Sequence, residues 1–258
     1  MEIFILISLI ISFPIGIISF FIVNKQIGFI AEGIAHIAFG GLALGLILDI
    51  SPFFVGAIVA VLSGLLITYL SLKGKVSENL FIGVFLSFSM SIGIILIKLS
   101  GKYGVDLFSY LFGSILNITD SHIIYIFIFS ISITVLFIIF RKKIAFFIFD
   151  PLFLKIKGIN INLMYYTIVA IISISIIYLI RIMGIIMISG IMIIPGLISF
   201  FITSNYKKEV LFSISISFLM LISGIYLSYI YSFLPPGPTI IIVGVIFLLL
   251  SFIFKKRK

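Results

Sequence analysis

The sequence lacks the residues on which most soluble and secreted proteins depend. It has no cysteine, which excludes disulfides and thiolate metal sites, and it has no tryptophan. Only 10% of its 258 residues are charged, whereas 63% are hydrophobic. A soluble surface needs about a quarter of the residues to be charged. We therefore predict an all-α polytopic membrane protein, in which each spanning helix takes about 20 apolar residues.

Several functional motifs are absent as well. There is no G-x-x-x-x-G-K-[ST] phosphate loop, so the chain cannot power itself with ATP by that route. An H-E-x-x-H zinc-protease motif and an arginine-rich voltage-sensing helix are also missing. The net charge of +9 comes from short basic clusters between apolar runs. Such clusters are typical of topology control, so we expect no nucleic-acid partner.

The apolar runs predict about eight to nine transmembrane helices. We place them at residues 3–23, 29–48, 53–72, 80–99, 123–140, 164–180, 184–203, 210–231 and 239–254. The less apolar segment 103–118 is predicted to be a short re-entrant or interfacial helix. If nine spans cross with the N-terminus outside, most Lys and Arg residues lie in the cytoplasm, as the positive-inside rule requires. We expect a single transmembrane domain over residues 1–258 with a cytoplasmic C-terminus.

The longest predicted loop covers residues 141–163 and is cytoplasmic in this topology. Asp150 before Pro151 is a helix-start signal, and Gly158 is a stop signal. Apolar residues between them, together with Phe149, indicate a short amphipathic helix of about two turns. From the residues alone, this helix either lies on the lipid surface or docks into a cytoplasmic partner.

A carboxylate and an imidazole lie four residues apart inside the second predicted span. Residues i and i+4 share one helix face, so Glu32 and His36 are expected to lie close together. Ionisable groups at membrane depth are costly, and their default interpretation is functional. The two side chains are also common ligands for zinc-like divalent cations. One helix cannot complete such a site, so a second copy of the chain or water must supply the rest.

Small residues and one proline mark the other candidate positions. Gly41 and Gly45 have the spacing that lets two membrane helices approach closely. Pro195 and Gly196 interrupt the span 184–203, either as a simple kink or as part of a substrate pathway.

Two charged residues near span ends complete the candidates. Glu78 fits an acidic residue in the first turn of a helix, where it faces the positive end of the helix dipole. Arg181 at a helix end can extend its charged group to the lipid headgroups.

Several blocks of this sequence together resemble one family. They are A-E-G-I-A-H-I-A-F-G-G at 31–41, K-G-K-V-S-E at 73–78, S-Y-L-F-G-S-I-L at 109–116, F-D-P at 149–151 leading to G-I at 158–159, R-I-M-G at 181–184, I-I-P at 193–195 and L-P-P-G at 234–237. In order and spacing over nearly the whole chain, they are similar to the permease subunit of ABC-type zinc/manganese uptake transporters.

This resemblance implies a homodimer of permeases on two cytoplasmic ATPase subunits, with an outer metal-binding protein that delivers the cation. It implies that Glu32 and His36 line the metal pathway, and that the helix around Asp150–Gly158 couples to the ATPase. Many members carry Asp where this chain has Glu32, and Ala31 replaces a common Gly. The cation, whether zinc, manganese or iron, therefore stays open. No cofactor is expected beyond the transported metal, and ATP hydrolysis is expected on the partner chain.

Two alternatives remain from the sequence. One is an importer of a metal chelate, such as a siderophore or cobalamin, whose wider pathway would need no ligand pair. The other is a membrane-integral enzyme or scaffold without a transport role.

Overall fold

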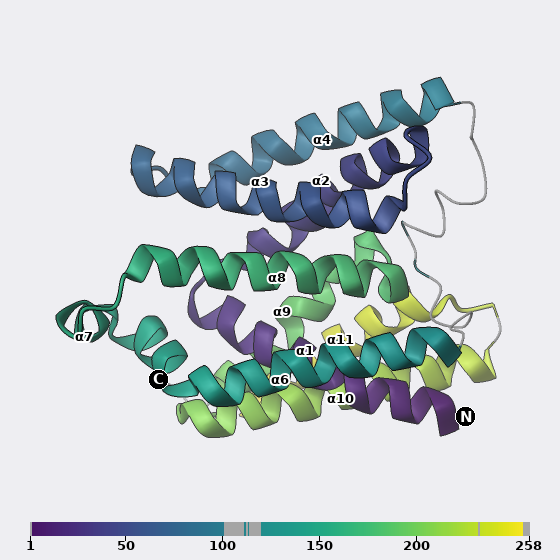
Figure 1. Ribbon diagram of the computed structural model, residues 1–258. Helices are drawn as coiled ribbons and strands as arrows, with labels where there is room; N and C mark the ends of the chain where they lie inside the picture. The colour runs from purple at the N-terminus through teal and green to yellow at the C-terminus, as the bar shows by residue number, and fades with distance from the viewer. Residues whose placement is uncertain (1, 101–110, 112, 114–119, 232, 255–258) are drawn as a thin grey trace. The chain divides into compact units, whose positions relative to one another are not determined.

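The structure, a computed structural model, describes residues 2–100, 111, 113, 120–231 and 233–254. These residues form ten α-helices, one short 3-10 turn and no strand (Figure 1). The all-helical prediction is therefore confirmed. The predicted re-entrant segment 103–118 lies almost entirely outside the described residues.

Eight helices are long and apolar enough to cross a membrane. They are α1 (Glu2–Asn24), α2 (Gly28–Ile47), α3 (Pro52–Gly74), α4 (Glu78–Ser100), α6 (Asp120–Phe149), α8 (Ile161–Met183), α9 (Ile185–Ile202) and α10 (Tyr206–Ile230). The last apolar helix, α11 (Pro236–Ser251), is shorter at 16 residues. Each falls on a predicted span, and the count agrees with the predicted eight to nine.

The loop predicted at residues 141–163 is shorter in the structure. Helix α6 continues through Arg141, Lys142 and Lys143 and ends at Phe149. The apolar run ends near residue 140, but Arg and Lys are good helix formers, so the helix extends beyond it. A short helix, α7 (Pro151–Ile156), follows before α8 begins at Ile161.

The described residues form two compact units. Unit 1 contains residues 1–26, 115–161 and 190–258, and unit 2 contains residues 27–114 and 162–189. Thus α1, α6, α7, α10 and α11 belong to unit 1, whereas α2, α3, α4 and nearly all of α8 belong to unit 2. Helix α9 begins in unit 2 and ends in unit 1.

Unit 1 is built around α1, which packs against α10 and α6. A Cβ at Gly16 would lie 2.5 Å from the Cα of Ile214 on α10, so only glycine permits this approach. Ser213 Oγ also donates to the Gly16 carbonyl at 2.8 Å. The Asn24 side chain at the end of α1 donates to Glu209 at the start of α10 at 2.6 Å. Serine, glycine and a satisfied polar pair therefore hold these helices together.

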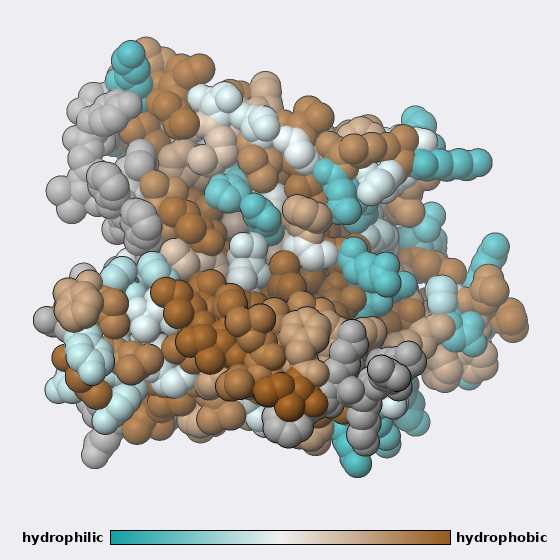
Figure 2. All heavy atoms as spheres, turned by 180° about the vertical axis from the view of Figure 1, so that it is seen from behind, coloured by the Kyte–Doolittle hydropathy of each residue, from teal (hydrophilic) through white to brown (hydrophobic). Residues whose placement is uncertain are grey.

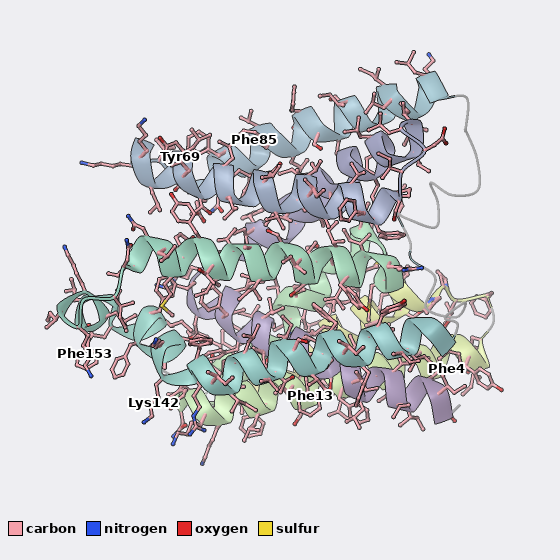
Figure 3. The ribbon with its side chains drawn as sticks, viewed as in Figure 1. Phe4, Phe13, Tyr69, Phe85, Lys142 and Phe153 are labelled. Atoms are coloured by element: carbon pink, nitrogen blue, oxygen red, sulfur yellow. The ribbon has the colours of Figure 1, made fainter. Side chains whose placement is uncertain are left out.

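Lys25 and Lys142 lie at the same end of unit 1. Lys25 Nζ lies 4.2 Å from the ring centroid of Phe147, so the end of α1 meets the end of α6. Lys142 and Phe153 lie at this end, and Phe4 lies at the opposite end (Figure 3). Helix α11 ends here too, because Phe252 contacts Phe201 at the end of α9, with ring centroids 5.0 Å apart. We call this the basic end of unit 1.

Apolar side chains cover much of the surface. Figure 2 shows them over most of the visible face. On α4, Leu80, Val84 and Phe88 are each more than 60% exposed, and on α6 Ile124 is 61% exposed. Water would penalise such a surface, whereas lipid chains match it.

Candidate functional site

Helix α2 carries Glu32 and His36 one turn apart. Both side chains are half-buried, and their immediate neighbours Ala31, Gly33 and Ala35 are buried. A Cβ at Gly33 would overlap Ile82 on α4, so the glycine lets the two helices approach closely. The small residues around the pair therefore place a carboxyl group and an imidazole within a tightly packed helix layer.

The buried nitrogen of His36 has no hydrogen-bond partner within the described part of the chain. Its Nδ1 atom is inaccessible to solvent and unpaired. Buried polar atoms in native proteins are nearly always hydrogen-bonded, so such an atom needs an explanation. A neutral imidazole nitrogen is a metal ligand, and Glu32 on the same face offers an oxygen ligand. The pair is therefore suited to bind a divalent cation transiently.

A closed metal site is absent from the residues that the structure describes. Nowhere among them do three or more His, Cys, Asp or Glu side chains form a group that could hold a metal ion. A structural zinc site takes four protein ligands and a catalytic site takes three. Glu32 and His36, one turn apart on α2, are two candidate ligands and fall short of either number.

Gly41 and Gly45 lie where α2 contacts α3. A Cβ at Gly41 would lie 2.8 Å from the Cβ of Val59, and one at Gly45 would lie 2.7 Å from the Cα of Pro52. Both distances are shorter than real Cβ contacts allow. Larger residues at either position would push α3 away from the helix that carries His36.

Glu78 is the first residue of α4 and is contacted from α8. The Tyr165 hydroxyl donates to Glu78 Oε2 at 2.6 Å. The other carboxyl oxygen, Oε1, is buried without a hydrogen-bond partner in the described structure, as is Oγ1 of the fully buried Thr68 on α3. Sequence reasoning missed Tyr165 and Thr68, because neither stands out from the apolar helices around them.

Arg181 lies in the last turn of α8. Its guanidinium is exposed and lies 5.2 Å from the ring centroid of Phe53 at the start of α3. Both residues belong to unit 2. This cation–π contact holds Arg181 at a helix end.

Helix α7 has the predicted start and stop signals. The Asp150 side chain accepts a hydrogen bond from the Phe153 N–H at 3.2 Å, and Pro151 occupies the first turn. Gly158 has φ +74°, a conformation that glycine adopts at no steric cost. Leu154 is 2% exposed and holds the helix to unit 1. The local structure predicted for this segment is therefore confirmed.

The outer side of α7 is apolar and exposed. Leu152 and Ile156, four residues apart, are 68% and 84% exposed, and Phe149 just before the helix is 56% exposed. Lys155 and Lys157 flank them and are exposed as well. We call Phe149, Leu152 and Ile156 the apolar face of α7.

Pro195 lies inside α9, which continues as a helix on both sides of it. The next residue, Gly196, donates its backbone N–H to Ser19 Oγ on α1 at 2.7 Å. A Cβ at Gly196 would overlap the Ser19 carbonyl group. The close approach of α9 to α1 thus depends on this glycine, and a serine hydroxyl satisfies its N–H.

Lys25 lies between α1 and α2, outside both spans. Burial lowers the pKa of its ammonium group below the ordinary value. The nearby Phe147 ring, 3% exposed, is also stacked on Phe21. Neither this contact nor the buried Glu209 was identified from the sequence, because both depend on pairs of helices that are far apart in the chain.

The chain belongs to the ABC 3 transport family, whose model matches residues 1–255. The prediction of a permease of this family is confirmed. Over 111 residues the chain is 37% identical to an uncharacterized membrane protein of Synechocystis, a match that covers 43% of the chain and 40% of that protein.

Longer matches extend over almost the whole chain. The high-affinity zinc uptake system membrane protein ZnuB of Haemophilus influenzae is 26% identical over 96% of the chain and 93% of its own length. The manganese transport system membrane protein MntC of Listeria innocua is 24% identical over 94% and 86%. Among solved structures, PsaBC from Streptococcus pneumoniae in complex with Fab matches with a TM-score of 0.85 and 25% identity, covering 96% of this chain and 89% of that one.

Proposed function

We propose that this protein is the membrane permease of an ATP-driven importer of zinc or manganese. The observation that carries the proposal is the Glu32–His36 pair on α2, with a buried imidazole nitrogen that has no hydrogen-bond partner in the described structure. Relatives that cover nearly the whole chain belong to a zinc uptake system and a manganese transport system. In this proposal Glu32 and His36 bind the ion in turn along the pathway, and a second copy supplies the remaining ligands.

We further propose that the apolar face of α7 docks on a separate ATPase subunit. The exposed Leu152 and Ile156 are costly in water, whereas Asp150 and Gly158 fix the ends of the helix that presents them. The basic end of unit 1 includes α7 and the end of α11. By the positive-inside rule, we expect that end to face the cytoplasmic side of a bacterial plasma membrane, where the ATPase subunits would bind. An extracytoplasmic metal-binding protein would then deliver the ion at the other side.

The first test is the metal content of cells. The permease is expressed with its ATPase and binding protein in an uptake-deficient host, and zinc, manganese and iron are measured by elemental mass spectrometry. We expect one of these metals to rise, and His36→Ala or Glu32→Gln to reduce that rise at least about tenfold. Such a loss is at the lower end of what removing even a ligand-orienting group costs.

The matched control is His122→Ala, because His122 is the only other histidine of the chain. It should import at the wild-type level. Normal import by His36→Ala and Glu32→Gln, at matched membrane levels, would contradict the pathway role of the pair. An intact, ATPase-active complex that accumulates no divalent metal would instead favour a chelate as substrate.

A further inference from the structure

A hydrogen bond joins two helices of unit 2, α8 and α4. Tyr165 on α8 donates its hydroxyl hydrogen to Glu78 on α4 at 2.6 Å. A half-buried carboxyl group in an apolar layer is costly to leave without donors. Tyr165 therefore holds α8 to the start of α4.

Helix α4 in turn contacts α2 next to each residue of the Glu32–His36 pair. One turn after Glu78, Ile82 packs against Gly33, where no side chain would fit. Two turns further, Ser89 Oγ donates to the Ile37 carbonyl at 2.8 Å. Gly33 follows Glu32 in the chain, and Ile37 follows His36. A displacement of α4 therefore reaches the backbone at both candidate ligands.

Helix α8 is also the first helix after α7. Only residues 157–160 separate the end of α7 from the start of α8, and Tyr165 lies in the second turn of α8. The connection between α7 and α8 is therefore short, and the Tyr165 hydroxyl joins the start of α8 to α4.

We infer that Tyr165 and Glu78 are positioning residues that couple movement of α8 to the metal-binding helix α2. The inference rests on the proposed function, because it needs an ATPase that moves α7. The contact is better suited to this role than to metal binding. It offers a metal ion only one carboxyl group and one hydroxyl group, and no group of three His, Cys, Asp or Glu side chains exists among the described residues.

The test measures coupling, since contiguous packing alone does not establish it. In the full complex, Tyr165→Phe removes the hydroxyl and keeps the ring. We expect metal uptake to fall at least about fivefold, the lower end of allosteric coupling, while ATP hydrolysis stays within about twofold of wild type.

Tyr166→Phe is the matched control and should keep the wild-type ratio of metal imported to ATP hydrolysed. Glu78→Gln keeps an acceptor for Tyr165 and should retain most of the coupling, whereas Glu78→Ala should lose it.

A second readout does not depend on the identity of the metal. The chain has no cysteine, so Phe29→Cys, at an exposed position in the first turn of α2, gives one labelling site in each copy of this chain. We expect ATP to change the rate at which the introduced cysteine reacts with a maleimide in the otherwise wild-type complex. In a complex that also carries Tyr165→Phe, ATP should leave that rate unchanged. Wild-type coupling in Tyr165→Phe, or an α2 that does not respond to ATP in the wild-type background, overturns the inference. If the wild-type complex imports no metal but Tyr165→Phe abolishes the response of α2, the proposed substrate is wrong and the coupling contact stands.

Discussion

His36 differs from two buried serines of the same unit. Ser89 and Ser173 donate to backbone carbonyls and so cost little when buried. His36 Nδ1 has no such partner in the described structure. A residue kept only for packing would be more stable as an apolar side chain. The unpaired nitrogen, with a carboxyl group one turn away, therefore favours a binding role over packing alone.

Lys25 provides a residue-scale prediction about charge. Burial already lowers the pKa of Lys25, and the Phe147 ring 4.2 Å away opposes this by stabilising the ammonium form. Phe147→Leu should therefore lower the pKa of Lys25 further. The measurement is an NMR pH titration of isotopically methylated lysines, with Lys157 as the control because it lies over Phe153 instead. An unchanged or higher pKa of Lys25 would contradict the role of the ring.

The depressed pKa of Lys25 also makes the stability of the folded protein depend on pH. The unfolded chain binds more protons than the folded one between the lowered folded pKa and the ordinary value of Lys. Over that window the stability of the folded protein should rise with pH, and below it the cost of burying the charge is fully present. Lys25→Met should flatten this part of the profile, which thermal unfolding in detergent between neutral and alkaline pH can measure. Lys207→Met, in the exposed first turn of α10, is the control and should leave the slope unchanged.

Among the elements, α7 is short but well defined at both ends. Six residues cannot form a stable helix alone, so Asp150, Gly158 and the buried Leu154 must hold it in place. The consequence is a fixed apolar face with Leu152 and Ile156 exposed. A rigid face of this kind suits repeated docking against a partner that changes shape.

The α7 prediction concerns assembly with the ATPase. Leu152→Asp and Ile156→Asp should each reduce co-purification of the ATPase subunit by about tenfold or more, because loss of a central apolar anchor costs at least about 2 kcal/mol. Lys142→Glu is the control, because it changes charge at the same end of unit 1 but outside α7. Undiminished co-purification of both aspartate variants would place the docking surface elsewhere.

At the scale of the whole molecule, the proposal that a second copy completes the set of metal ligands can be tested. If each transporter needs His36 from both copies, an equal mixture of wild-type and His36→Ala chains leaves only about a quarter of the dimers intact. Metal uptake should then fall to about a quarter of wild type, measured in cells that express both chains at equal levels. A fall to about half would indicate that each copy transports independently. Wild-type chains mixed with His122→Ala chains provide the control for expression level.

The described residues divide into two compact units, whereas the sequence alone suggests no division. The sequence predicts a single domain, and the described residues form two compact units, each assembled from separate segments of the chain. The segments of unit 2 are joined by contacts such as Tyr165 with Glu78, and those of unit 1 by contacts such as Asn24 with Glu209. The single domain stays a prediction, as do the homodimer and the cytoplasmic C-terminus.

The sequence by itself determined whatever depends on residues near one another in the chain. Apolar runs of about 20 residues locate the membrane helices, because lipid leaves the backbone no other way to satisfy its hydrogen bonds. The repeat of the α-helix puts Glu32 and His36 on one face, and Asp150 with Gly158 marks the ends of α7.

Only the tertiary structure decided which helices meet. The Tyr165–Glu78 bond joins residues 87 positions apart, and the Asn24–Glu209 bond joins residues 185 apart. No local pattern marks either pair, because a lone polar residue in an apolar span has the same sequence signature whether its partner is lipid headgroup, water or another helix. The close helix approaches at Gly33 and Gly196 likewise depend on the residues that these glycines meet, Ile82 and Ser19, which the sequence does not identify.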